Sequence, residues 1–158
     1  MKMICFDMDG TIADLYGVDD WLDSLRNEDP TPYLIARPMW NMNALRSVLL
    51  RLAEQGWEIR VISWLAKDST ESYKELVREA KLAWLRRFNF PTDRVHLVAY
   101  GTTKADCVRR YFDGEPMVLV DDNDKVRNGW HLGDTINPIE IEDLPKELEK
   151  LLDNSNKE

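Results

Sequence analysis

Short apolar runs alternate along the chain with longer segments in which apolar residues recur every three or four positions. The short runs occupy residues 1–6, 57–63, 94–100 and 116–120. They are typical of buried strands. The longer segments occupy residues 40–56, 68–88 and 104–112. They are typical of amphipathic helices. Strands that alternate with helices predict an α/β fold, a doubly wound parallel sheet with helices on both faces.

Local signals refine the helix boundaries. Gly56 is expected to stop the first long helix, and Asp68 or Ser69 is expected to cap the second. A short helix after residue 123 and a terminal helix over 144–152 follow, before a polar tail from Asn154. The second long helix carries five cations, interpreted as its solvated face. They are Lys74, Arg78, Lys81, Arg86 and Arg87.

One irregular segment, residues 14–38, separates the first strand from the first long helix. It contains three prolines and several acids, and it is longer than a crossover connection needs. We therefore interpret it as a small cap-like insertion over the strand ends. The whole chain, residues 1–158, is interpreted as a single domain carrying this insertion, because the length suits one core and no linker composition interrupts it.

Charge and composition narrow the function classes. Hydrophobic residues make up 44% of the chain and the formal net charge is -8, which argues against a broad electrostatic grip on nucleic acid. Cys5 and Cys107 have no metal-ligand spacing and are expected to be reduced thiols, so we expect a cytoplasmic protein. No apolar stretch predicts a signal peptide or a membrane span.

Polar residues gather where the predicted strands end. In an open parallel sheet the carboxyl ends of the strands form the ligand-binding crevice. The residues expected there are Asp7, Asp9, Ser63, Lys104, Asp121 and Asp122. Carboxylates crowded together repel one another, and a hard cation such as Mg²⁺ offsets that repulsion. Since Mg²⁺, a lysine and a serine all attract phosphate oxygens, the set predicts a site for a phosphoryl group.

The chain resembles the phosphatases of the haloacid dehalogenase superfamily. Four segments match its motifs in order: "FDMDGT" at residues 6–11, "VIS" at 61–63, Lys104 at a helix start, and "VLVDDN" at 118–123. The resemblance spans residues 3 to about 124. It implies a Rossmann-like haloacid dehalogenase fold, here with a small cap, and a Mg²⁺-dependent phosphomonoester hydrolase similar to 5′-nucleotidases and polynucleotide 3′-phosphatase domains.

The resemblance also implies a role for each matching residue. Asp7 would be the nucleophile that forms an aspartyl-phosphate, and Asp9 would protonate the leaving oxygen and later activate water. Ser63 would hydrogen-bond a phosphoryl oxygen, and Lys104 would neutralise charge beside Asp7. The metal ligands would be Asp7, the backbone carbonyl of Asp9, and Asp122 with Asp121 in support.

Two assignments remain open on the sequence alone. Lys67 follows Ser63 closely and is an alternative to Lys104 as the phosphate-binding lysine. Four aromatic residues in or near the insertion and the second strand end could stack on a base or a sugar, which favours a nucleotide or another small phosphomonoester as substrate. They are Trp21, Tyr33, Trp40 and Trp64.

Two other functions compete with the small-molecule phosphatase. The small cap and the cationic helix would also suit a phosphatase that acts on the 3′ end of a nucleic acid. A non-catalytic binding module of the same fold is the third possibility, although such relatives usually lack one of the two acids, and Asp7 and Asp9 are both present.

Overall fold

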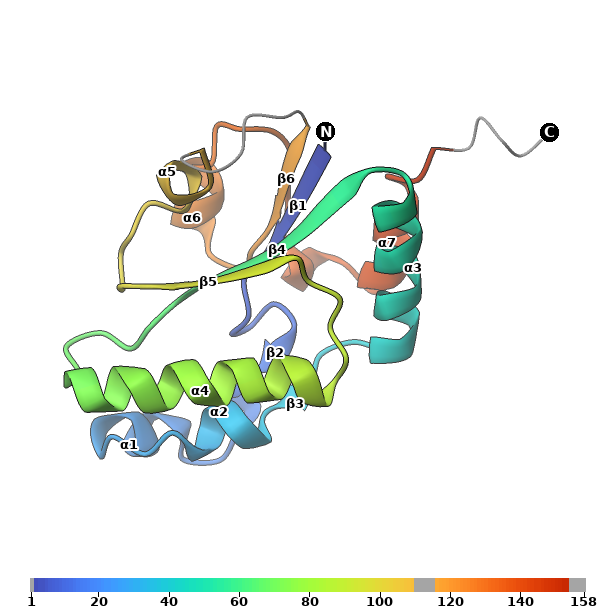
Figure 1. The fold of residues 1–158 in the computed structure, drawn as a ribbon. Helices are drawn as coiled ribbons and strands as arrows, with labels where there is room; N and C mark the ends of the chain where they lie inside the picture. The colour runs from blue at the N-terminus through green and yellow to red at the C-terminus, as the bar shows by residue number, and fades with distance from the viewer. Residues whose placement is uncertain (1, 110–115, 154–158) are drawn as a thin grey trace.

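The computed structural model describes residues 2–109 and 116–153, and a five-stranded parallel sheet forms its centre (Figure 1). The strands lie in the order β5-β4-β1-β6-β7. Their bounds are β1 Lys2–Phe6, β4 Trp57–Trp64, β5 Arg94–Val98, β6 Met117–Val120 and β7 Thr135–Ile136. The predicted strands are therefore confirmed, although the third ends at Val98 rather than at residue 100.

Helices cover both faces of the sheet. Successive side chains of a strand point to opposite faces, so a strand that is apolar throughout needs a covering layer on each face. Ile4 and Phe6 of β1 pack into a core with α3 (Met42–Glu54), α4 (Glu71–Arg87) and α7 (Leu144–Glu149). Met3 and Cys5 pack into a second core with α5 (Lys104–Arg109) and residues near α6 (Asp124–Asn128). The doubly wound α/β fold predicted from the alternating pattern is confirmed.

Strand register brings the predicted site residues to one edge of the sheet. The chain passes from β1 to β4 and β5 on one side, then crosses to β6 and β7 on the other. Phe6 is paired with Val61 on β4 and with Val120 on β6. The residues that follow Phe6 and Val120, Asp7 and Asp121, therefore leave the sheet side by side at the point where the strand order reverses.

The irregular segment forms a small substructure with a hairpin at its base. β2 (Ala13–Asp14) pairs antiparallel with β3 (Arg37–Pro38). Between them lie the 3₁₀ helix η1 (Leu15–Gly17) and two short helices, α1 (Trp21–Arg26) and α2 (Thr31–Ile35). α2 packs against α4, and α1 lies next to α2 (Figure 1).

Glu28 fastens this substructure to the start of α4. Its carboxylate accepts hydrogen bonds from the backbone N–H and the hydroxyl of Thr70, both at 2.9 Å. Thr70 is also the N-cap of α4, with its Oγ1 accepting from the N–H of Tyr73. The prediction that Asp68 or Ser69 caps this helix is therefore wrong. Asp68 instead lies in the loop before the helix and has a φ of 53°.

Parts of three predicted segments lie outside the described residues. These are residue 1 of the strand predicted over 1–6, residues 110–112 of the helix predicted over 104–112, and the polar tail from Asn154. A second 3₁₀ helix, η2 (Pro138–Glu140), leads from β7 towards α7. Among residues 2–109 and 116–153, no helix has the length and apolar character needed to cross a bilayer.

Candidate active site

A tight turn after β1 presents the first acidic residues. The N–H groups of Thr11, Ile12 and Ala13 all donate to the carbonyl of Met8 at 3.0–3.1 Å. Gly10 makes this turn with a φ of 77°, and a Cβ at that position would lie 2.4 Å from Oδ2 of Asp122. Only glycine meets both conditions without strain, so Gly10 lets the β1 loop approach the β6 loop.

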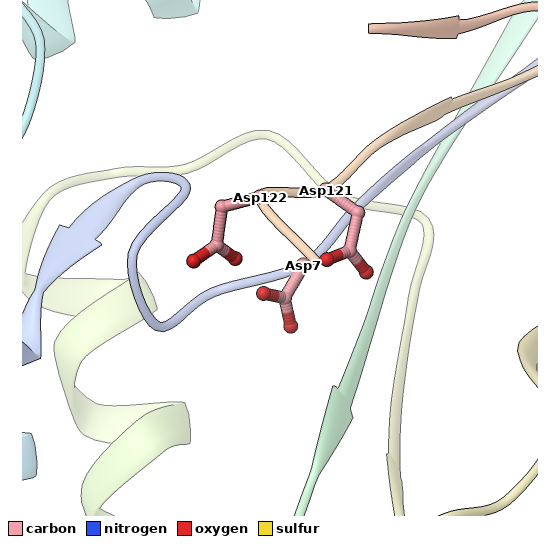
Figure 2. A group of neighbouring side chains, drawn as sticks. All are labelled: Asp7, Asp121 and Asp122. Atoms are coloured by element: carbon pink, nitrogen blue, oxygen red, sulfur yellow. The ribbon is translucent and has the colours of Figure 1, made fainter. Parts of the chain in front are cut away.

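Three carboxylates, from Asp7, Asp121 and Asp122, converge at the ends of β1 and β6 (Figure 2). One oxygen from each lies within 4.8 Å of the others. Burial, and then the neighbouring charge of Asp7, raise the pKa of Asp121 to about 6 and that of Asp122 to about 7. The arrangement thus concentrates negative charge that a bound cation would stabilise.

Lys104 lies between two of these carboxylates. Its Nζ donates to Oδ1 of Asp7 at 3.0 Å and to Oδ2 of Asp121 at 2.7 Å. Burial alone would lower the pKa of Lys104, but the two carboxylates outweigh it and raise the pKa. The alternative lysine, Lys67, is exposed and lies 5.6 Å from the ring centroid of Tyr100. Of the two lysines, Lys104 is the one that contacts the acidic cluster.

Asp121 and Asp122 differ in how many of their oxygens are engaged. Oδ2 of Asp121 accepts from Lys104, and its Oδ1 accepts the N–H of Asn123 at 2.9 Å. Asp121 is 1% exposed. Asp122 is less buried, and its Oδ1 accepts the hydroxyl of Thr11 at 3.2 Å. Asp122 therefore has the carboxylate that is more open to a ligand.

Lys81 is a buried residue of the site, although the sequence pattern predicted an exposed position for it. It was interpreted as part of the solvated face of its helix, but it is 1% exposed. Its Nζ donates to Oδ2 of Asp9 at 2.9 Å, to Oγ of Ser63 at 2.7 Å and to the carbonyl of Trp64 at 2.9 Å. Burial raises the pKa of Asp9, and the Lys81 ammonium acts in the opposite direction. Asp9 thus faces Lys81 rather than the other three carboxylates.

All six predicted site residues line one pocket of about 350 Å³. They share it with aromatic rings from both sides of the site. Tyr16 and Trp21 from the insertion make an edge contact with ring centroids 5.0 Å apart, and Trp64 and Tyr100 make a tilted contact at the same distance. Tyr33 also lines the pocket.

The prediction that Trp40 could stack on a ligand is wrong. Trp40 does not line this pocket; it packs against the core, and its Nε1 donates to the carbonyl of Thr11 at 2.7 Å. Tyr16 and Tyr100 line the pocket although the sequence interpretation missed them. Tyr16 could have been found from its place next to the β1 turn, whereas Tyr100 lies in a loop without a distinguishing pattern.

Lys81 could have been found from helical spacing. It lies four positions after Val77 and eight after Tyr73, and both of these are fully or almost fully buried. Residues at this spacing share one helix face. A lysine on the apolar face of a helix is seldom buried unless it is paired, so its position predicts a buried acidic partner.

The chain has the fold of solved phosphatase structures. The D,D-heptose 1,7-bisphosphate phosphatase from B. bronchiseptica, solved with magnesium and phosphate, is 16% identical with a TM-score of 0.61 and aligns over 96% of this chain and 98% of its own. The same enzyme from Burkholderia thailandensis is 14% identical with a TM-score of 0.59, over 96% and 99%.

A chain of the Pnkp1/Rnl/Hen1 complex is also similar, with 18% identity and a TM-score of 0.55. The match covers 85% of this chain but 45% of the other, so the similarity is to less than half of that larger chain. No family model and no curated protein matches the sequence. At these identities the likeness is one of fold, and it agrees with the doubly wound α/β fold predicted from the sequence.

Proposed function

We propose that this protein is a Mg²⁺-dependent phosphomonoester hydrolase that works through an aspartyl-phosphate on Asp7. The observation that carries the proposal is the contact of Lys104 with Asp7 and Asp121 beside Asp122, at the adjoining ends of β1 and β6. Such a set combines a carboxylate nucleophile, a fixed positive charge and candidate ligands for a metal. The shared fold with solved phosphatases supports the same activity.

The donor set fits Mg²⁺. Carboxylate and carbonyl oxygens are its preferred ligands, and Mg²⁺ uses one or two carboxylates together with substrate phosphate oxygens. Asp7 and Asp122, with the backbone carbonyl of Asp9, would hold the ion. Asp121 would support them by holding Lys104, since both of its oxygens already accept hydrogen bonds. Bound Mg²⁺ would supply positive charge that neutralises and orients the phosphoryl group.

The reaction proceeds in two steps, phosphoryl transfer to Asp7 and hydrolysis of the aspartyl-phosphate. A carboxylate oxygen of Asp7 attacks phosphorus, the bond from phosphorus to the leaving oxygen breaks, and Asp9 gives that oxygen a proton. Water then attacks the phosphorus of the aspartyl-phosphate while Asp9 takes its proton, which releases inorganic phosphate and restores Asp7. Ser63 donates a hydrogen bond to a phosphoryl oxygen, and Lys104 offsets negative charge beside Asp7.

A nucleoside monophosphate is the substrate class that the pocket favours. The pocket volume of about 350 Å³ suits a small ligand. The pairs Tyr16–Trp21 and Trp64–Tyr100 offer aromatic surfaces beside the acidic cluster. Bases stack on such surfaces, whereas a sugar phosphate without a planar ring gains less from them.

The likeness to a chain of the Pnkp1/Rnl/Hen1 complex favours a second candidate, a phosphatase for nucleic-acid 3′ ends. The charge of the insertion argues against it. Exposed acids precede and begin α1 at Asp19, Asp20 and Asp23, and they would repel an extended polyanion. Lys81, one of the cations that would have helped, is buried and paired with Asp9.

The test is hydrolysis of a panel of phosphomonoesters, with and without Mg²⁺, by the wild type and by Asp7→Asn. Asp7→Asn should remove turnover and keep the fold, because an amide does not attack phosphorus. Asp106→Asn is the matched control, since Asp106 is an exposed acid on α5 that does not line the pocket. Full activity in Asp7→Asn would exclude covalent catalysis by this residue.

A burst experiment tests the intermediate directly. In Asp9→Asn, p-nitrophenyl phosphate should still phosphorylate Asp7, because p-nitrophenolate leaves without a proton, whereas hydrolysis of the aspartyl-phosphate should be slow. We expect one equivalent of p-nitrophenolate to be released rapidly per active site. A linear time course with no burst would argue against an accumulated aspartyl-phosphate.

A further inference from the structure

Lys81 is a buried cation that the four motifs do not include. It lies on α4, and its ammonium group is surrounded by Asp9 from the β1 loop and by Ser63 and Trp64 at the end of β4. The ring of Tyr33 from the insertion lies 5.2 Å from its Nζ. One side chain therefore joins α4, two strand ends and the insertion.

The ammonium group has no donor left for a substrate. A lysine ammonium has three N–H donors, and Lys81 has three oxygen acceptors at 2.7–2.9 Å. It is 1% exposed and does not line the pocket. Lys81 therefore differs from Lys104, which lines the pocket, and any effect of Lys81 on a reaction must pass through the groups it holds.

The direction of these hydrogen bonds constrains both pocket residues. An ammonium group only donates, so Oδ2 of Asp9 must be an acceptor in this contact. A proton carried by Asp9 therefore resides on its other oxygen, Oδ1. Ser63 accepts from Lys81 in the same way, so its single hydroxyl proton is available for another acceptor. Lys81 thereby fixes one carboxylate and one hydroxyl at the same time.

We propose that Lys81 is a positioning residue that orients Asp9 for proton transfer to the leaving oxygen and Ser63 for donation to a phosphoryl oxygen. This inference rests on the proposed function, in which Asp9 protonates the leaving group. It adds to that function a residue outside the four motifs, and it explains why a helix of the outer layer carries a buried cation. Burial of an unpaired charge is costly, so the cation is retained only where its partners hold it.

Leaving-group dependence separates this role from a purely structural one. A nucleoside leaves as a poor anion and needs a proton, whereas p-nitrophenolate leaves without one. kcat/KM reports only the steps up to release of the leaving group, so hydrolysis of the aspartyl-phosphate does not affect it. The ratio of kcat/KM for a nucleoside 5′-monophosphate to kcat/KM for p-nitrophenyl phosphate therefore measures proton transfer by Asp9. Loss of folded protein lowers both values equally and leaves the ratio unchanged.

The experiment compares the wild type, Lys81→Met, Lys81→Arg and Arg78→Met in the presence of Mg²⁺. Lys81→Met should lower the ratio roughly 10- to 100-fold, the range that corresponds to a lost hydrogen bond to a charged group. Lys81→Arg keeps a buried donor cation and should restore part of the ratio. Arg78→Met is the control, because Arg78 is a partly exposed cation on the same helix that pairs with Glu75 one turn away and does not line the pocket; its ratio should equal that of the wild type.

A double variant tests whether Lys81 acts through Asp9. Adding Lys81→Met to Asp9→Asn should lower the ratio no further, because the proton-transfer group is already absent. A ratio unchanged in Lys81→Met, or a further fall in the double variant, would overturn the proposal. If Lys81→Met does not fold, Lys81→Gln replaces it, with a fall of at least about threefold expected and an unchanged ratio overturning the proposal. A wild type that hydrolyses neither substrate would overturn the proposed function itself.

Discussion

Thr11 and Asp122 bond each other twice, across 111 positions of sequence. The hydroxyl of Thr11 donates to Oδ1 of Asp122 at 3.2 Å and accepts the backbone N–H of Asp122 at the same distance. Oγ1 of Thr11 is also 3.4 Å from Oδ2 of Asp7. Thr11 is completely buried, so its hydroxyl fixes the separation of the β1 loop and the β6 loop.

Removal of this hydroxyl should destabilise the protein. Thr11→Val keeps the shape but leaves the partly buried N–H and one carboxylate oxygen of Asp122 without their partner, at a cost of about 1–3 kcal/mol in the free energy of unfolding. Thr11→Ser keeps the hydroxyl and should lose less. Denaturant unfolding of the three proteins measures this, and equal stability of Thr11→Val and the wild type would contradict the prediction.

Metal binding should stabilise the protein through Asp122 more than through Asp121. A ligand that binds only the folded state at a concentration 100 times its Kd adds about 2.7 kcal/mol, so Mg²⁺ should raise the Tm and a chelator should reverse the shift. Asp122→Asn should abolish most of this shift, because it removes a proposed ligand.

Asp121→Asn should behave differently, because Asp121 is bonded to Lys104 and to the N–H of Asn123. It should lower the Tm even without metal, since Lys104 loses one of its two buried carboxylate partners and keeps only Asp7. A thermal-shift titration of both variants with Mg²⁺ distinguishes them. An identical Mg²⁺ response in Asp122→Asn and the wild type would show that Asp122 is not a ligand.

Gly10 and Gly101 form a matched pair for testing the close approach of the two loops. Both have positive φ, 77° and 85°, but a Cβ at Gly10 would meet Asp122, whereas a Cβ at Gly101 would have no neighbour within 4 Å. Each alanine variant should lose roughly 1–2 kcal/mol of stability from the backbone conformation. Gly10→Ala should in addition displace Asp122 and weaken the Mg²⁺-induced rise in Tm. A normal Mg²⁺ response in Gly10→Ala would contradict the proposed metal site.

The sequence predicts this fold well because its signals are local and agree with one another. Buried runs such as residues 2–6 form strands, the segment from Met42 to Glu54 forms a helix, and the alternation requires a parallel sheet. The convergence of Asp7 with Asp121 follows from topology alone, because neighbouring parallel strands end at the same edge. The doubly wound α/β fold therefore follows from the sequence pattern.

The errors concern side chains whose environment depends on tertiary packing. The spacing of Lys81 from Tyr73 and Val77 indicates a buried position, but only the register of α4 against the strand ends identifies Asp9 as its partner. Trp40 follows the insertion in sequence, but its indole donates a hydrogen bond to the carbonyl of Thr11. Tyr16 and Tyr100 line the pocket, and Trp40 does not. A sequence pattern gives the face of a helix, but not the partner that covers it.

Recognition of the leaving group should depend on the aromatic pair at the sheet side of the pocket. Tyr100 is 55% exposed, so Tyr100→Ala removes a stacking surface with little effect on the core. Stacking on an aromatic side chain is worth about 1–3 kcal/mol per base, and we expect KM for a nucleoside monophosphate to rise roughly tenfold while kcat changes little. Trp64→Ala should raise KM and also lower kcat, because the ring of Trp64 lies 5.5 Å from Nζ of Lys104.

Trp57→Phe is the control for both alanine variants, since Trp57 lies at the start of β4, at the opposite end from Trp64, and its buried Nε1 has no hydrogen-bond partner among the described residues.

Nucleoside monophosphates should also be hydrolysed faster than 3′-phosphorylated oligonucleotides, because the acids of the insertion repel a polyanion. Kinetics with both substrates over a range of salt concentrations test this. Faster hydrolysis of the oligonucleotide, with a rate that falls steeply as salt rises, would favour a nucleic-acid end as the substrate.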